Sequence, residues 1–227
     1  MSPVASSRLL AGAILALVLG DPTDACTCAP LHPQMAFCQA DVVIRGKFVG
    51  VTPLSPTRST EEFESWIRYE INVTKTYKGP ESPGDVIFID SWQKFCAYQH
   101  SAPLDGKEEY LIMAARQGEH LFISLCSFVH PWGSVPPSQR HGVSQAYREG
   151  CACEVVWCRS MPCELSGDAQ CPWTVGLEDW NWQGPQAERQ ACLPHPSQGA
   201  PHGAHPVCAW ETLEDSFSEA TANSPGL

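Results

Sequence analysis

Cysteine is the residue type in this 227-residue chain whose number and spacing offer the most chemistry. Three pairs, Cys26-x-Cys28, Cys151-x-Cys153 and Cys158-x4-Cys163, are spaced in the manner of zinc ligands, but structural zinc sites need thiolates, which an oxidising compartment removes. An even count in an exported chain is typical of a disulfide framework. We therefore expect six disulfides, made by Cys26, Cys28, Cys38, Cys96, Cys126, Cys151, Cys153, Cys158, Cys163, Cys171, Cys192 and Cys208.

The chain carries none of the short motifs that mark common active sites. It has no H-E-x-x-H, no G-x-S-x-G and no phosphate-binding glycine loop. An N-terminal cysteine could act as a nucleophile activated by its own amine, but Cys26 would then need a free thiol and would leave another cysteine unpaired. Twelve cysteines pair without remainder, so we predict that the protein is not an enzyme.

The first 25 residues have the layout of a secretory signal peptide. Arg8 precedes the apolar run 9–20, and small residues, Thr23 and Ala25, stand at the −3 and −1 positions of a cleavage site before Cys26. A membrane anchor is the alternative, but twelve apolar residues fall short of the ~20 that a spanning helix needs. We predict a signal peptide over 1–25, a secreted extracellular product and no membrane span.

The charge of the remaining chain excludes some partners. Without Arg8, Asp21 and Asp24, it has 13 basic and 23 acidic residues, so its net charge is negative. Such a chain has no electrostatic footprint for nucleic acid or for an anionic membrane.

The residues exposed by that cleavage, Cys26-Thr27-Cys28-Ala29-Pro30, have an unusual arrangement. Cysteines at i and i+2 of an extended chain point to the same side, so bridging both would fix a terminus that normally frays. The α-amine and carbonyl of the first residue could then form a five-membered chelate with a metal. A zinc protease keeps an open ligand position for water, and a rigid chelator that enters it would displace the attacking water.

The two halves of the chain differ in how they can build a core. The first half has a β pattern at 41–51, 66–77, 85–92, 109–115 and 120–129, separated by turn residues. Five short strands favour a small closed barrel, since closure removes exposed edges, and 138–148 is predicted to be a short flanking helix. The second half holds seven cysteines between Cys151 and Cys208, so we expect a small hairpin-and-loop domain held by disulfides.

Three further segments carry their own predictions. The insert 195–206, with His195, His202 and His205, is expected to be a flexible loop rather than a metal site, because nothing there fixes the geometry of its histidines. Residues 211–227 are predicted to be an acidic flexible tail. Asn72-Val73-Thr74 is an N-glycosylation sequon on the polar face of its strand, which places Ile71 and Val73 inward.

The stretch CTCAPLHPQMAFCQADVVIRGKFVG, residues 26–50, resembles the N-terminus of the tissue inhibitors of metalloproteinases. The similarity continues through Tyr77-Lys78-Gly79-Pro80, Glu109-Tyr110-Leu111-Ile112 and Cys126-Ser127-Phe128-Val129, although no paralogue is assigned. The resemblance implies a mainly β fold, with an OB-like (netrin-type) inhibitory domain over 26–151, a disulfide-rich domain over 152–210 and the tail. It also implies the pairings Cys26–Cys96, Cys28–Cys126, Cys38–Cys151, Cys153–Cys208, Cys158–Cys163 and Cys171–Cys192.

The resemblance further implies a role for individual residues in inhibiting matrix metalloproteinases. Cys26 would ligate the zinc of the protease in trans, so the protein would need no cofactor of its own. Thr27 would enter the S1′ pocket, and progelatinases would dock on the C-terminal domain. The remaining protease contacts would be Cys28, Ala29, Pro30, Gln39, Gln93, Lys94 and Leu125.

Two other functions remain open at this point. A non-inhibitory netrin-type binding module would share the fold and the Cys-x-Cys start, but such modules usually lie inside longer chains. A growth-factor-like role at a cell-surface receptor is compatible with inhibition. The inhibitor is favoured because the predicted cleavage makes Cys26 the first residue.

Overall fold

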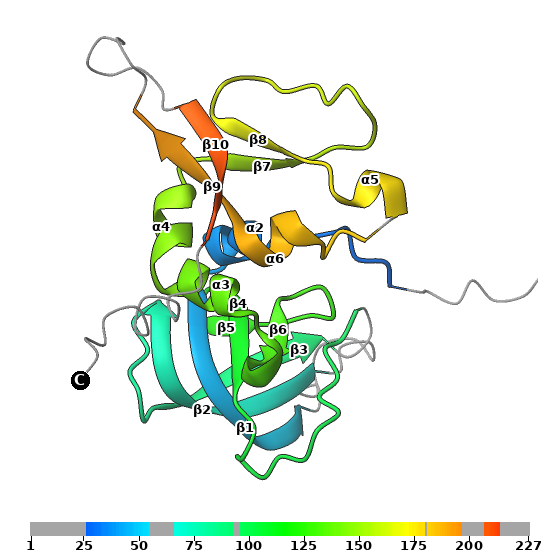
Figure 1. Cartoon of the computed structure of the whole chain (residues 1–227). Helices are drawn as coiled ribbons and strands as arrows, with labels where there is room; N and C mark the ends of the chain where they lie inside the picture. Colours follow the sequence, from blue (N-terminus) through cyan, green and yellow to red (C-terminus); the bar gives the residue numbers. More distant parts are fainter. Residues whose placement is uncertain (1–25, 55–65, 93–95, 180, 197–206, 214–227) are drawn as a thin grey trace, which may run out of the picture.

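The computed structural model describes residues 26–54, 66–92, 96–179, 181–196 and 207–213 (Figure 1). We call residues 26–151 the ring region and 152–213 the C-terminal region. Among the helices of the described residues, none has the length and apolar character needed to cross a bilayer.

The ring region contains a closed sheet of five strands. Its strands are β1 (Val42–Leu54), β2 (Trp66–Lys78), β3 (Val86–Trp92), β4 (Tyr110–Gln117) and β5 (His120–Phe122), in the order β1-β2-β3-β5-β4, and a β1–β4 pairing closes the ring. The β3–β5 pair is parallel and the other ring pairs are antiparallel. A sixth strand, β6 (Val129–Pro131), pairs with β4. The predicted mainly β fold with five ring strands is confirmed.

One predicted strand, 120–129, is interrupted. The chain leaves the sheet after Phe122 and returns to it only at Val129. Between them, Ser124 and Ser127 hold a turn, in which the Ser124 N–H donates to Ser127 Oγ at 2.9 Å and the Ser127 N–H donates to Ser124 O at 3.0 Å. The sequence pattern did not reveal this turn, because Leu125 and Cys126 continue the apolar run from Ile123 to Val129 across it.

Alternating side chains explain the core of the ring. Ile44, Ile71 and Ile112 have no exposed surface, and all belong to one apolar cluster inside the ring. Gly46 lies where strands β1 and β2 approach closely: a Cβ there would lie 2.7 Å from Ile71 Cγ2. Ile71 and Val73 point inward as predicted, so Asn72 between them faces outward.

Short helices lie between the ring and the C-terminal region (Figure 1). Helix α2 (Pro33–Gln39) begins with proline at its first position and ends before the extended Ala40. A continuous helical stretch follows β6 and the 3-10 turn η1 (Trp132–Ser134), formed by α3 (Pro137–His141), the π-helix η2 (Gly142–Ala146) and α4 (Tyr147–Gly150). The predicted helix at 138–148 is confirmed.

The described part of the C-terminal region contains two two-stranded sheets and two short helices. Strands β7 (Glu154–Trp157) and β8 (Gln170–Trp173) are parallel, whereas β9 (Gln190–His195) and β10 (Val207–Thr212) form an antiparallel hairpin. The helices are α5 (Gly176–Asp179) and α6 (Pro185–Arg189). The core of this region contains Cys153, Cys171, Cys192 and Cys208 together with Trp173 and Trp182.

Two predicted boundaries in this region need correction. His195 is not part of a loop: it ends β9, pairs with Val207, and its Nε2 lies 3.0 Å from a Glu211 carboxylate oxygen. The predicted tail begins too early, because β10 continues to Thr212 and the buried Leu213 donates its N–H to Arg189 O at 2.7 Å. Both extensions are backbone pairings that local composition does not indicate. Residues 197–206 and 214–227 lie outside the described residues.

Candidate functional site

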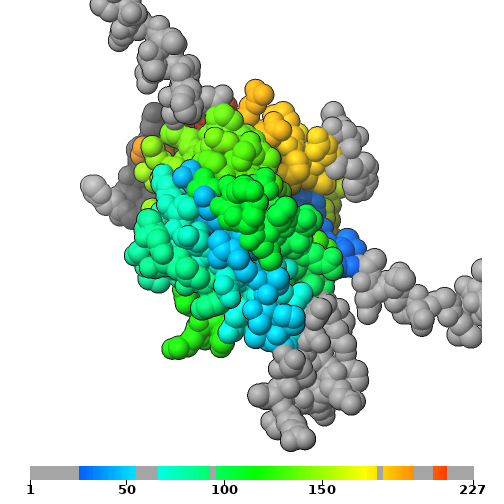
Figure 2. Space-filling view, turned by 90° about the horizontal axis from the view of Figure 1, so that it is seen from below, coloured from blue at the N-terminus to red at the C-terminus, as the bar shows by residue number. Residues whose placement is uncertain are grey.

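The N-terminal segment, residues 26–31, is neither helix nor strand and is fixed by two disulfides. Cys26 is bridged to Cys96 and Cys28 to Cys126, each with a Cα–Cα distance of 5.3 Å. In Figure 2 the blue residues that follow position 25 reach the rim of the molecule, where Thr27, Cys28 and Ala29 are exposed. The segment is therefore held at both cysteines while its surface stays accessible.

The two anchoring segments are also bound to each other. Ala97 and Ser124 form an isolated β-bridge, and the Leu125 N–H donates to the Cys96 carbonyl at 2.6 Å. Cys96 itself has a φ of 52°, a left-handed conformation that is uncommon for a residue with a Cβ. The parallel strands β3 and β5 lead into these anchors, so the ring determines where Cys26 and Cys28 are attached.

Beside the segment lies a hollow of about 250 Å³. It is lined by Cys28, Ala29, Pro30 and Leu31 of the segment, and by residues that include Leu125, Phe128 and His130. The His130 ring packs edge-on against Phe128 with a centroid separation of 4.3 Å, while the rest of His130 is exposed. The lining is mixed in character, because Ser127 and Gln183 border the hollow beside these apolar side chains.

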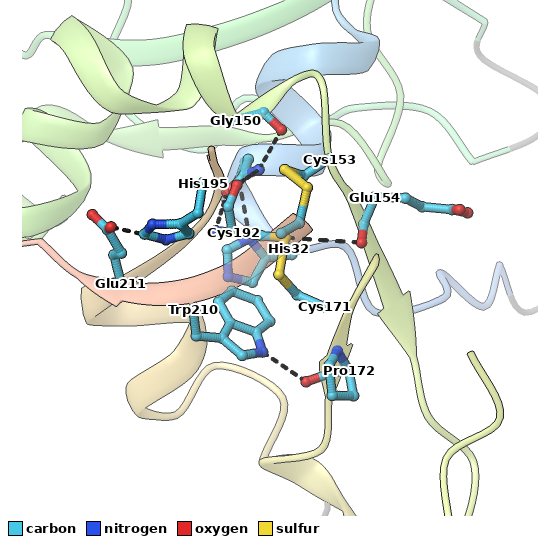
Figure 3. Close-up of a disulfide and its surroundings, with 12 residues drawn as sticks. His32, Gly150, Cys153, Glu154, Cys171, Pro172, Cys192, His195, Trp210 and Glu211 are labelled. Atoms are coloured by element: carbon cyan, nitrogen blue, oxygen red, sulfur yellow. Dashed lines mark hydrogen bonds and ion pairs between the residues drawn. A yellow bond between two sulfur atoms is a disulfide. The ribbon is translucent and has the colours of Figure 1, made fainter. Parts of the chain in front are cut away.

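The base of the segment is held by the C-terminal region (Figure 3). His32 is 1 % exposed, its Nδ1 accepts the Gln34 N–H, and its Nε2 lies 2.9 Å from Gln186 O. Its ring packs against the indoles of both Trp173 and Trp210, with centroid separations of 5.3 and 5.2 Å. Burial lowers the pKa of His32 to about 4, with the hydrogen bond to Gln186 opposing the shift, so the imidazole is neutral at pH 7.

Gln34 makes the second connection to the C-terminal region. It has no exposed surface, and its Nε2 donates to both Gly150 O and Cys192 O at 2.8 Å. Its Oε1 accepts the Cys192 N–H, also at 2.8 Å. One amide thus satisfies three buried backbone groups on elements far apart in sequence. Sequence reasoning missed both His32 and Gln34, because no local motif distinguishes them from solvated polar residues.

The other predicted contact residues lie in three settings. Leu125 is 53 % exposed at the hollow, and Gln39 lines an adjacent hollow together with Ser124 and Cys126. Gln93 and Lys94 lie outside the described residues.

Next to the anchors, at the ends of β3 and β5, is an aromatic cluster that the sequence did not reveal as a group. Trp66 stacks on Trp92 with centroids 5.8 Å apart and packs against Phe122 at 5.4 Å.

All twelve cysteines are bridged, in the pairs Cys26–Cys96, Cys28–Cys126, Cys38–Cys151, Cys153–Cys208, Cys158–Cys163 and Cys171–Cys192. These are the pairs that the resemblance implies. Sulfur atoms of Cys26, Cys28 and Cys126 lie within 4.8 Å of one another, as do those of Cys153, Cys192 and Cys208. Because each of these sulfurs is in a disulfide, neither group offers a thiolate to a metal.

Comparison with known proteins gives the same assignment over most of the chain. The family model for tissue inhibitor of metalloproteinase matches residues 24–210. Metalloproteinase inhibitor 2 of Homo sapiens is 35% identical over 214 residues, covering 89% of each chain. The Gallus gallus protein of the same name is 37% identical over 215 residues, with 87% of this chain and 86% of the relative covered. This chain therefore belongs to the tissue inhibitor of metalloproteinase family.

Proposed function

We propose that this protein inhibits secreted zinc metalloproteinases, matrix metalloproteinases among them, by placing the α-amine and carbonyl of Cys26 on the catalytic zinc. Family membership supports an inhibitor rather than an enzyme. Removal of residues 1–25 would create the amine, and the zinc would come from the target, so the inhibitor would bring no metal of its own. The chelate would fill the position that a catalytic zinc keeps open for water.

The observation that carries this proposal is the double attachment of the N-terminal segment. Cys26 and Cys28 are bridged to segments that are themselves joined by a β-bridge and a short hydrogen bond. Fixing the backbone of one free residue costs about 1–2 kcal/mol, and here that cost is met when the inhibitor folds rather than when it binds. Preorganisation of this kind increases affinity without adding contacts.

The neighbouring residues would then contact the protease. Thr27, exposed between the two anchors, would direct its side chain into the S1′ pocket. Cys28, Ala29 and Pro30 would lie along the cleft, with Leu125 and Gln39 on the flank. Gln93 and Lys94, which precede the Cys96 anchor in sequence, would extend the contact on the other side.

Location and further partners also belong to this proposal. Six disulfides and the predicted signal peptide support secretion to the extracellular space. Progelatinases would bind through the C-terminal region and the acidic residues that follow it, with an attraction that salt screens.

The experiment compares the removal of two different disulfides in the secreted protein. Replacing both Cys26 and Cys96 with serine should weaken inhibition of a matrix metalloproteinase roughly 100-fold or more, because about two residues must then be ordered on binding. The control is the double serine variant of Cys158 and Cys163, whose bridge closes a loop in the C-terminal region. Equal inhibition by the Cys26/Cys96 variant and the native protein, with hydrogen exchange showing an intact ring, would show that inhibition does not depend on fixing Cys26 by its disulfide.

A further inference from the structure

The outer face of strands β2 and β3 carries an apolar patch beside the Asn72 sequon. Val86 and Phe88 are 54% and 51% exposed. Their neighbours in β3, Ile87 and Ile89, pack toward the core inside the ring, so Val86 and Phe88 point to solvent. Two large apolar side chains on an open sheet face are an association hazard unless something covers them.

Asn72 lies within reach of both side chains. The β2–β3 register pairs Asn72 directly with Val86 and Glu70 with Phe88, so Phe88 is the diagonal neighbour of Asn72. Directly paired side chains in a sheet have Cβ atoms about 5 Å apart, and diagonal pairs about 7–8 Å. Among the described residues, none hydrogen-bonds to the Asn72 carboxamide, so a glycan on its nitrogen would break no hydrogen bond between described residues.

The Phe88 ring is in contact with a charged group on the same face of the sheet. The Arg68 guanidinium lies 5.7 Å from the ring centroid. Arg68 is fixed by two hydrogen bonds to the buried Asp90, at 2.7 and 2.8 Å. Because the guanidinium cannot swing away without losing both bonds, the ring has a fixed support on that side while half of its surface stays exposed.

We propose that Asn72 carries an N-linked glycan whose first N-acetylglucosamine packs over Val86 and Phe88. The C–H groups of a pyranose and the methyl of its acetyl group are apolar and slightly positive. They match an aliphatic side chain and the negative face of an aromatic ring. The group that covers the patch is thus a modification of the protein itself. It also gives a role to the Asn72-Val73-Thr74 sequon, which the inhibitory site does not use.

The glycan would leave the inhibitory site free. Asn72 lies six residues along β2 from Trp66, whose ring marks the end of the sheet next to the anchors. At a rise of about 3.3 Å per residue this separates the two positions by roughly 20 Å. The proposal therefore stands or falls independently of zinc chelation.

The first arm of the test asks whether the glycan exists. The full chain is secreted from eukaryotic cells, and the peptide containing Asn72 is analysed by mass before and after an amidase that converts glycosylated asparagine to aspartate. We expect a glycan mass on that peptide, lost in Asn72→Gln. An unmodified Asn72 would overturn the proposal.

The second arm asks where the first sugar lies. Trimming to a single N-acetylglucosamine should leave a thermal midpoint about 2–4 °C above that of Asn72→Gln. The difference should vanish when Val86 and Phe88 are both replaced by serine. It should persist in Val51→Ser, a control at an exposed valine of β1. A midpoint difference that survives loss of Val86 and Phe88 would overturn the packing, and Asn72→Gln should inhibit metalloproteinases as well as the native chain.

Discussion

The ring region and the C-terminal region bury their cores with different chemistry. The ring fills its interior with aliphatic and aromatic side chains from strands of alternating pattern, such as Ile44, Ile71 and Ile112. The C-terminal region packs two disulfides against Trp173 and Trp182. A short segment has too little apolar surface to bury, and cross-links make up the difference. The two regions should therefore respond differently to loss of a bridge and to loss of a methyl group.

A third set of contacts joins the two regions. An apolar cluster with Ala36, Phe37 and Tyr147 from the ring region also includes Ala191 and Leu213 from the C-terminal region. Beside it, His32 and Gln34 bind backbone groups of Gln186 and Cys192. The contrast between the regions can thus be tested at three places: inside each core and at the junction.

The largest effect is expected from removing the buried bridge Cys171–Cys192. Both cysteines are at most 1% exposed, and replacing them with alanine removes a cross-link worth about 2–4 kcal/mol and leaves a cavity. Hydrogen exchange should show loss of protection in β7 to β10 and retained protection in the ring strands. An equal loss of protection in the ring region and the C-terminal region would contradict the view that only the C-terminal region depends on this bridge. The Cys158–Cys163 bridge, which closes a loop of sequence separation 5, should matter less.

The junction should be weakened most by Gln34→Leu. The change leaves two carbonyls and one N–H unpaired in a buried setting, and each such group costs about 1–3 kcal/mol. We expect a loss of about 3 kcal/mol in the free energy of unfolding, measured with denaturant. The matched control is Gln39→Leu on the exposed end of the same helix, which should change stability by less than about 0.5 kcal/mol. Similar losses of stability in the two variants would show that the Gln34 hydrogen bonds do not stabilise the junction.

His32 should make the junction sensitive to acid. Its folded-state pKa, about 4, lies below the ordinary value of 6.5, so the unfolded chain binds more protons between these values and stability falls as pH drops through this window. The contribution of neutral His32 to the free energy of unfolding is fully present above pH 6.5. By pH 4 about 3 kcal/mol of that contribution is lost. Unfolding followed from pH 7 to pH 4 should show a shallower pH dependence in His32→Gln. Parallel curves for the two proteins would contradict this assignment.

The smallest effect is expected inside the ring. Ile71→Val removes one methylene-sized group from a fully buried position and should cost about 1 kcal/mol. Hydrogen exchange should place the loss in β1 to β3, with β7 to β10 unchanged. A loss shared by both regions would mean that they unfold as one unit.

Much of the ring could be predicted from sequence, whereas the junction could not. The alternation of apolar and polar residues indicates strand β2, and the inward position of Ile71 and Val73 follows from it. Four of the five predicted strands needed no more than boundary shifts, but the Ser124–Ser127 turn replaced part of the fifth. A turn held by serine hydroxyls has no hydrophobic period to detect.

The sequence predicted that disulfides fix the N-terminal segment, but it did not predict the buried contacts that hold the base of that segment. The i, i+2 spacing of Cys26 and Cys28 indicated a clamp, while the choice of Cys96 and Cys126 as partners needed the family resemblance. Gln34 bonds to Cys192 across 158 positions, and no local pattern encodes such a contact. The stacking of Trp66 on Trp92 likewise depends on the β2–β3 register.

The most direct test of the account is inhibition by a protein that keeps one extra residue before Cys26. Retaining Ala25 blocks the five-membered chelate and puts bulk into the zinc position. We expect a loss of several kcal/mol in binding, on the order of 100-fold or more, because even disturbing groups that merely support metal ligands costs 10–100-fold. Hydrogen exchange should match that of the native protein. An Ala25-extended protein with the same fold and undiminished inhibition would contradict zinc chelation by Cys26.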